Sequence, residues 1–501
     1  MDAPRTRVRA AALLASCGLL ATLVAFLINL HRPFGLTDEG FQYLLSRSWA
    51  RGENLFQRFE LLYPAGQYAW YGAWMALLGD AVWVLRLGRA LLCGVTAAVV
   101  WHAVRRWSGQ AVAWAVAIAV AVADPGLAVG VAAAAVMALA LSLARPQRPG
   151  PRVLAVTAAL AGWALAWRED VAVLALALAL YVAWRRRGGA PDALRAIGGL
   201  AAGLGPWLVL EAARGELAPF VSHLAERVGL LFPRLAQPRH TLLFLNYGAS
   251  LSSPRAVVGS LVPLLVLVPP LIYVGLLVRQ GWRAHGGLQV DRQQVAAALA
   301  GLAFVPQLLW ERPDLWHLRA HLVVLLAVLG VVAGSFSARR RRQVAGALAA
   351  LAAVMGVVLV IQYRLADAGV YPCGEGKRIG ARLENGAPPW ACLPSAPNET
   401  LIVLPWGPGW YALEAPVPGT RVLAAIDRHV TRAAIVDAAC ADLRRPANRW
   451  VITGRNWVRT ARLPGEVAIS QTILGGYRHV TTWNEWELWE RVAGEEGKGK
   501  R

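Results

Sequence analysis

Acidic residues are scarce in the apolar N-terminal part of the chain, so the few that occur there are informative. Three clusters bring some of them together with each other or with basic residues: Asp38-Glu39, Arg168-Glu169-Asp170, and Glu311-Arg312-Pro313-Asp314 followed by His317 and Arg319. A carboxylate within reach of a hydroxyl can act as a general base. Arginine offers a permanently charged, planar fork that suits phosphate. The residue types are therefore those of a general base and an anion-binding site.

The composition indicates that membrane helices position these residues. The chain is 57% hydrophobic and 16% charged, whereas soluble domains carry about a quarter charged residues. Its net charge of +21 comes mainly from arginines, which stand in short clusters between long apolar runs. Such clusters are typical of cytoplasmic loops in membrane proteins. Membrane lipids are therefore expected partners, and nucleic acid is not.

The apolar runs between the basic clusters predict a polytopic α-helical membrane protein with about eleven transmembrane helices. The first run is long enough to span a bilayer and is interpreted as a helix with a cytoplasmic start, not as a signal peptide. All basic clusters then lie inside, and the three acidic clusters and the C-terminal region lie outside. The expected helices cover 10–30, 84–103, 111–123, 126–144, 153–167, 171–184, 196–213, 256–278, 294–310, 320–336 and 344–362.

The run between Arg152 and Arg185 contains Arg168-Glu169-Asp170 at its middle. A single helix would place these charges at the bilayer centre, where they are costly. Two short helices avoid this, but ~15 residues span only ~23 Å of a ~30 Å hydrocarbon core. Their turn must therefore be recessed in a wet, protein-lined cavity. The hairpin over 111–144, turning at Asp124-Pro125, has the same geometry, and together they predict a groove in the outer leaflet.

The C-terminal region changes character. Segments 400–404, 421–426 and 450–453 are strand-like, and 432–445 is an amphipathic helix between the last two, which is a βαβ-like pattern. We therefore expect a transmembrane core over 1–363 and a small extracytoplasmic α/β domain over 364–501. In an oxidising compartment Cys373 and Cys392 are able to pair, but the sequence leaves this pairing open.

The first acidic cluster lies in a segment with a recognisable pattern. Leu36-Thr37-Asp38-Glu39-Gly40-Phe41-Gln42-Tyr43, then Arg51-Gly52-Glu53 and Tyr63-Pro64-Ala65-Gly66-Gln67-Tyr68, resembles the first outer loop of GT-C glycosyltransferases. The similarity is greatest to the branch containing protein O-mannosyltransferases and lipid A aminoarabinose transferases. Residues 404–413 are similar to the C-terminal domains of bacterial members. The resemblance covers the layout of the whole chain, but in sequence it is specific only in the first loop and around Arg312–His317.

This resemblance implies a hexosyl- or pentosyltransferase of the bacterial plasma (inner) membrane. It would move a sugar, with inversion, from a polyprenyl-phosphate donor to a glycan, lipid or protein acceptor on the extracytoplasmic face. Asp38 would be the general base, with Glu39 orienting the acceptor or assisting. The arginine candidates for the phosphate are Arg168, Arg312 and Arg319, and the other substrate-binding candidates are Asp170, Asp314, His317 and Tyr63. Asp38 and Asp170 could share a divalent metal, but the sequence lacks metal-ligand spacing and no cofactor is expected.

Simpler readings stay open at this point. The Asp38-Glu39 pair could be ordinary solvated loop acids, and Arg168-Glu169-Asp170 could be a structural ion pair at a recessed turn. Pro313 could simply end a helix. A lipid-linked sugar flippase would spread polar residues through related halves, which the sequence does not show. A polysaccharide polymerase or ligase usually carries one large outer loop between helices, whereas here the large outer element is C-terminal.

Overall fold

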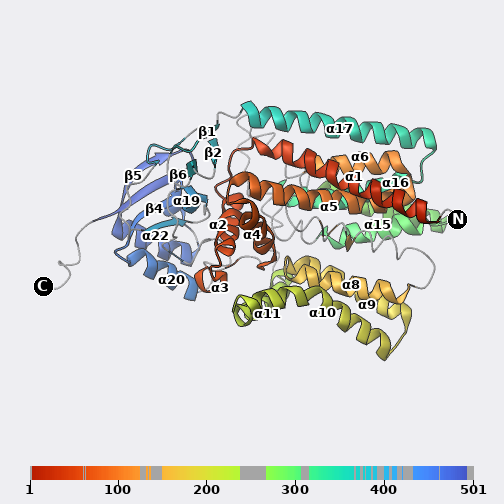
Figure 1. The fold of residues 1–501 in the computed structure, drawn as a ribbon, viewed down its shortest axis with the longest axis horizontal. Helices are drawn as coiled ribbons and strands as arrows, with labels where there is room; N and C mark the ends of the chain where they lie inside the picture. Colours follow the sequence, from red (N-terminus) through yellow and green to blue (C-terminus); the bar gives the residue numbers. More distant parts are fainter. Residues whose placement is uncertain are drawn as a thin grey trace. The chain divides into compact units, whose positions relative to one another are not determined.

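The structure is a computed structural model, drawn as a ribbon in Figure 1. It describes residues 3–59, 61, 64–123, 131, 133, 135–136, 149–236, 267–305, 315–365, 368–372, 376–377, 380–384, 387–391, 400–404, 409–413, 420, 433–461 and 463–492. The chain divides into two compact units. One comprises Met1–Leu30, Tyr63–Gln67 and Leu87–Val360, and the other comprises His31–Leu62, Tyr68–Arg86 and Ile361–Arg501. Each unit is described by itself below.

The first unit is helical throughout its described residues. Most of the expected membrane helices have counterparts in the structure, whereas 126–144 lies mostly outside the described residues and 256–278 and 294–310 lie partly outside them. The helices are α1 (Ala3–Leu30), α5 (Val82–Ser108), α6 (Gln110–Ala123), α8 (Pro151–Leu165), α9 (Glu169–Arg186), α10 (Ala190–Ala213), α11 (Leu217–Ala236), α14 (Val268–His285), α15 (Arg292–Ala303), α16 (Leu315–Ala333) and α17 (Ala338–Leu365). The first five residues of α5, Val82–Arg86, and the end of α17 from Ile361 belong to the second unit.

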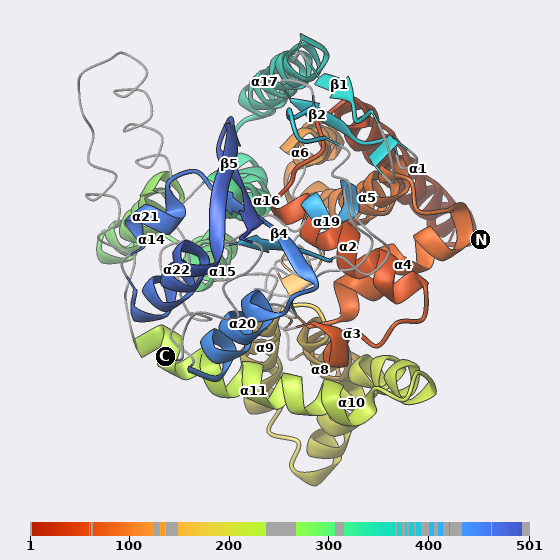
Figure 2. The same ribbon diagram turned by 90° about the vertical axis from the view of Figure 1, so that its left-hand side faces the viewer.

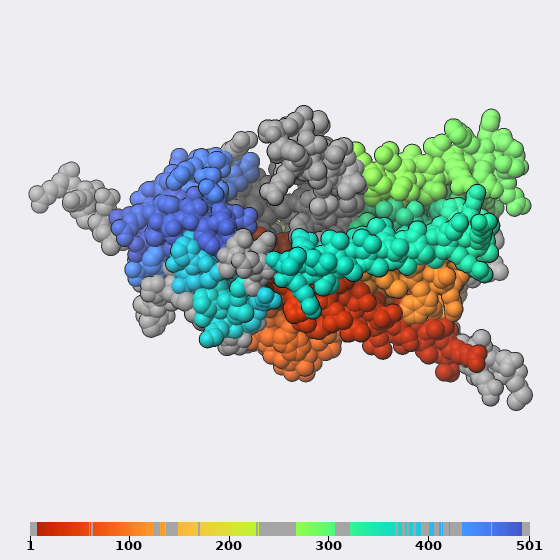
Figure 3. Space-filling view, turned by 90° about the horizontal axis from the view of Figure 1, so that it is seen from above, coloured from red at the N-terminus to blue at the C-terminus, as the bar shows by residue number. Residues whose placement is uncertain are grey.

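Four helices in the described part of the chain are long and apolar enough to cross a membrane: α1 from Val8, α5, α10 and α17. The apolar side chains of α1, α10 and α17 are widely exposed, whereas α5 is mostly buried, and Figure 3 shows α17 open along its length. On α17, Leu351, Val354 and Val358 are each more than half exposed. In water such a surface would be unfavourable, whereas in lipid it is the expected one. The chain is therefore a multi-pass helical membrane protein.

The hairpin expected around Arg168 is confirmed, because α8 and α9 are two short helices joined at residues 166–168. Helix α10 then packs closely on α8 through glycines. A Cβ atom on Gly203 would lie 1.9 Å from the Ala159 carbonyl oxygen, and one on Gly199 would lie 2.4 Å from that of Ala155. Small residues four apart allow membrane helices to approach this closely. The ends of α8, α9 and α10 are therefore held in a fixed relation.

The second unit begins with three helices where the sequence predicted an outer loop: α2 (Asp38–Ala50), α3 (Leu55–Arg58) and α4 (Gly66–Leu78), the last of which starts in the first unit. Helix α2 is buried from Glu39 to Ser48. It approaches α4 at Gly72, where a Cβ atom would lie 2.6 Å from the Trp49 ring. Polar residues buried on all sides of a helix give no amphipathic period, which is why the sequence did not predict α2.

The rest of the second unit is an α/β structure. Strands β3 (Thr400–Leu404), β4 (Asn448–Gly454), β5 (Tyr477–Trp483) and β6 (Trp486–Arg491) form a sheet in the order β3-β4-β6-β5. Strands β3 and β4 are parallel, and α20 (Ala433–Arg444) lies between them in sequence. The expected helix 432–445 and the expected strands 400–404 and 450–453 therefore have counterparts, whereas the βαβ-like pattern was expected with 421–426 as its first strand. Strands β5 and β6 form an antiparallel hairpin that the sequence analysis did not predict. A separate pair joins β1 (Ala368–Val370) to β2 (Arg382–Glu384).

Helices cover one face of the four-stranded sheet. Helices α20 and α22 (Pro464–Gly476) lie on one face (Figure 2), where Ile402 and Val451 pack against Ile435 and Ile469. Short helices α19 (Gly409–Leu413) and α21 (Trp457–Thr460) complete the unit. Of the three C-terminal cysteines, Cys440 is buried in α20 with a free thiol. Cys373, Cys392 and the expected strand 421–426 lie outside the described residues.

Candidate active site

The Asp38-Glu39 pair opens helix α2, directly after a turn that begins at the end of α1. The backbone N–H of Gly40 donates to Gly35 O at 2.8 Å and that of Phe41 donates to Thr37 O at 2.8 Å. Asp38 is therefore held in the first turn of α2, where the positive end of the helix dipole favours negative charge. Its side chain is exposed, so a substrate can reach it.

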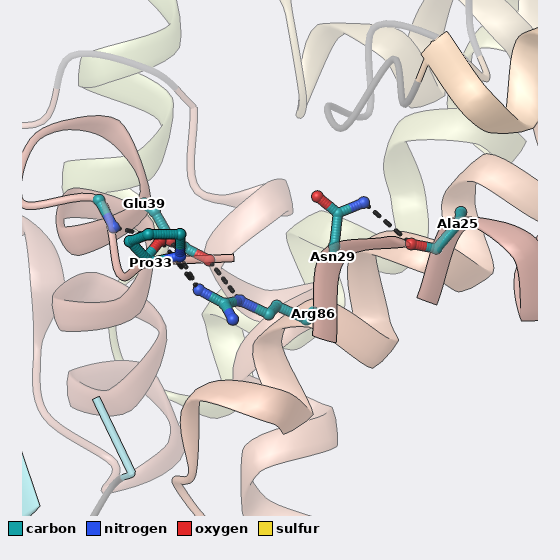
Figure 4. A network of polar contacts seen from close by, with 6 residues as sticks. Ala25, Asn29, Pro33, Glu39 and Arg86 are labelled. Carbon is teal, nitrogen blue, oxygen red and sulfur yellow. Dashed lines mark hydrogen bonds and ion pairs between the residues drawn. The ribbon is translucent and has the colours of Figure 1, made fainter. Parts of the chain in front are cut away.

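The neighbouring carboxylate is in the opposite environment. Glu39 is 5% exposed, and its Oε1 accepts from Arg86 Nε at 2.9 Å. Its Oε2 accepts from Arg86 Nη2 at 3.3 Å and from the Gly35 N–H at 2.9 Å. Figure 4 shows this paired arrangement, in which Arg86 also donates to the Pro33 carbonyl. The fork-to-fork pairing ties the start of α2 to the first turn of α5.

These contacts determine the charge state of Glu39. Burial alone would raise the pKa of its carboxyl group. The positive charges of Arg86 and Arg32, together with the hydrogen bonds, outweigh burial and lower the pKa to about 2. A carboxylate with so low a pKa is a weak base and is already fully hydrogen-bonded. The two adjacent acids are thus separated by environment into an exposed carboxylate and a fixed structural anion.

A second set of contacts holds the far end of α2. Asp80, at the turn between α4 and α5, pairs with Arg47 at 3.1 Å and with Arg51 at 3.5 Å. The hydroxyl of Tyr43, which is fully buried, donates to the Asp80 carbonyl at 2.5 Å. Helix α19 packs against α2 within the same unit. Because α2 is fixed along its length, the position of Asp38 at its first turn is fixed as well.

The remaining predicted site residues fall in the first unit or outside the described residues. Arg168 is the residue before α9 and its side chain is 7% exposed. Asp170 belongs to the first turn of α9, and His317 and Arg319 belong to α16. Tyr63, Arg312 and Asp314 lie outside the described residues. Among the residues that the structure does describe, no three His, Cys, Asp or Glu side chains are grouped as ligands of a metal ion.

The sequence analysis missed Arg86, the partner of Glu39. A signal was present, because Arg86 stands within an otherwise apolar run, Val82-Trp83-Val84-Leu85-Arg86-Leu87. An arginine at such a position needs a partner or a function. The pairing itself depends on the turn that brings α2 back to α5, which the residue pattern does not encode.

Comparison with known proteins gives a fold and no family. No family model matches the chain, and no curated protein matches it by sequence. Among solved structures, it is similar to the crystal structure of ArnT from Cupriavidus metallidurans bound to undecaprenyl phosphate. The TM-score is 0.55 at 14% sequence identity, over 97% of this chain and 99% of that chain. The expected GT-C similarity is therefore supported at the level of the fold. At this identity the likeness assigns no role to an individual residue.

Proposed function

We propose that this protein is a membrane glycosyltransferase that moves a sugar from a polyprenyl-phosphate donor to an acceptor hydroxyl on the extracytoplasmic face. The observation that carries the proposal is the separation of roles at α2, where an exposed Asp38 is held in place beside a buried, ion-paired Glu39. The fold likeness to a protein bound to undecaprenyl phosphate supports the class of donor. The basic last turns of α5 and α9 favour an arrangement in which these helix ends face the cytoplasm.

In the proposed reaction Asp38 accepts the proton of the acceptor hydroxyl as its oxygen attacks the anomeric carbon of the sugar. The bond from that carbon to the phosphate oxygen breaks in the same step, which inverts the configuration. The lipid phosphate leaves with the electron pair and needs no proton, but its charge must be neutralised. Arg168 is our first candidate for this role, before Arg312 and Arg319. Glu39 takes no proton in this scheme and instead positions the base through Arg86.

The proposal is tested by following labelled sugar from polyprenyl-phosphate donors in membranes that contain the wild type or Asp38→Asn. Loss of the base is expected to lower transfer by about 10²–10⁴-fold. The matched control is Asp437→Asn, which makes the same change at an exposed position on α20 and is expected to leave transfer unchanged. Unchanged transfer by folded Asp38→Asn protein would remove Asp38 from catalysis. If the wild type released no label from any donor, the glycosyltransferase reading would be wrong and lipid-linked sugar transport would be tested next.

A further inference from the structure

A second group of polar and aromatic residues lies in the first unit, at the ends where α8 and α10 finish and α9 and α11 begin. The glycine packing between α8 and α10 fixes this position. Trp163 and Trp167 have ring centroids 5.0 Å apart, and Trp207 on α10 meets Trp167 edge to face at 5.7 Å. We call Trp163, Trp167, Trp207 and Glu211 the α10-end cluster.

Glu211 is the unusual member of the α10-end cluster. It lies one helical turn after Trp207 and is 1% exposed. Among the described residues, neither of its carboxylate oxygens has a hydrogen-bond partner, and the indole N–H of Trp207 has none either. Most of α10 presents apolar residues outward, and only Asp192, Gly199, Gly203 and Glu211 are buried. The single acid of the last two turns is therefore turned inward, away from lipid.

Arg214, the next basic residue along the chain, does not donate a hydrogen bond to Glu211. Arg214 makes its ion pair with Glu216, at 3.4 Å, and Glu216 is itself 2% exposed. The backbone links the two acids, because the Glu216 N–H donates to the Glu211 carbonyl at 2.8 Å. A buried carboxylate without donors is costly. Glu39 shows that this chain supplies donors where a buried acid is structural, since both of its carboxylate oxygens accept hydrogen bonds from within the protein.

We propose that the α10-end cluster is the subsite for the sugar of the lipid-linked donor, with Glu211 accepting hydrogen bonds from sugar hydroxyls. A carboxylate offers up to about four acceptor positions, and the indole N–H of Trp207 is a donor beside it. Tryptophan rings provide the flat apolar surface on which a sugar ring packs. Arg168, our first candidate for the donor phosphate, directly follows Trp167 in the chain. This inference rests on the proposed function.

The test measures binding, not turnover, with the full-length protein in lipid nanodiscs and no acceptor present. The probes are radiolabelled undecaprenyl phosphate alone and undecaprenyl phosphate that carries mannose, glucose or arabinose. We expect the wild type to bind at least one sugar-bearing lipid more tightly than bare undecaprenyl phosphate. Glu211→Ala should weaken binding of that lipid about tenfold or more, because a hydrogen bond to a charged group is lost, and should leave bare undecaprenyl phosphate unaffected.

Two further variants keep the test decisive. Glu211→Gln preserves the shape of the side chain and should weaken sugar-dependent binding by several-fold even if Glu211→Ala folds poorly. Glu216→Gln is the matched control, because Glu216 is equally buried but already paired with Arg214, and should retain the preference for the sugar-bearing lipid. Equal losses for both lipids in the Glu211 variants, or no loss, would overturn the subsite and leave the proposed function standing. If the wild type bound neither lipid, the proposed function would fail first.

Discussion

Two buried glutamates in this protein differ in what surrounds them. Glu39 in α2 has Arg86 and the Gly35 N–H as donors to its two oxygens. Glu211 in α10 is buried at least as deeply, but the structure's described residues give its oxygens no donor. Burial alone therefore does not separate structural acids from functional ones. The supply of donors does, because a satisfied carboxylate is part of the fold, whereas an unsatisfied one points to a ligand.

The largest effect should come from breaking the satisfied pair. Arg86→Met leaves Glu39 buried without its main partner, and we expect a loss of about 3–5 kcal/mol in the free energy of unfolding. Chemical denaturation in detergent measures this loss. The double variant with Glu39→Leu removes both charges and should regain most of the stability. If the single and double variants were equally stable, the pair would not be what fixes the first turn of α2.

The pH dependence of the same pair gives a second test. The folded pKa of Glu39 is lowered from 4.5 to about 2, which corresponds to roughly 3 kcal/mol as an upper value. Because the pKa is lowered, this stabilisation is complete above about pH 4.5 and is lost as the pH falls toward 2. We therefore expect the stability difference between the wild type and Glu39→Gln to be constant above pH 4.5 and to shrink below it. Unfolding temperatures of both proteins from pH 6 to pH 2.5 check this, and a constant difference throughout would contradict it.

The α10-end cluster depends on how closely α10 approaches α8, which two glycine substitutions test. Gly203→Ala places a Cβ atom 1.9 Å from the Ala159 carbonyl oxygen, whereas the space around Gly198 on the same helix is open. We expect Gly203→Ala to destabilise the protein by about 1–3 kcal/mol through overpacking and to lower sugar-dependent binding. The control, Gly198→Ala, should be neutral or stabilising by about 0.5–1 kcal/mol from helix propensity. Equal effects of the two substitutions would show that the close approach at Gly203 does not matter.

The elements predicted from the sequence agree with the structure where an element forms without contacts to residues far away in the chain. The charges at Arg168 predicted a break between α8 and α9, because a single helix would bury them in lipid. Helix α20 and strands β3 and β4 followed from local periodicity. In contrast, α2 was missed because its polar residues are satisfied by Asp80 and Arg86, which are far away in sequence.

The residues of the candidate active site could be predicted from the sequence only in part. Asp38 and Glu39 stood out as acids after the first helix, but their separation into exposed and ion-paired carboxylates depends on Arg86. Glu211 gave no signal at all, because Glu211-Ala212-Ala213-Arg214-Gly215-Glu216 reads as an ordinary charged helix end. Its burial and its lack of donors are properties of packing between α8, α10 and α11. The sequence therefore shows which acids are present, whereas the fold determines which of them have hydrogen-bond donors.

The smallest expected effect is the one whose sign matters most. Glu39→Leu should destabilise the protein, because the buried charge of Arg86 would lose its carboxylate partner. Glu211→Leu removes a carboxylate that has no donor, so in nanodiscs without donor lipid it should be neutral or stabilising by about 1 kcal/mol. Thermal unfolding of both variants under one set of conditions measures the two signs. A clear loss of stability in Glu211→Leu would mean that the protein itself satisfies Glu211, which would make the two glutamates alike and remove the physical reason for a ligand at the end of α10.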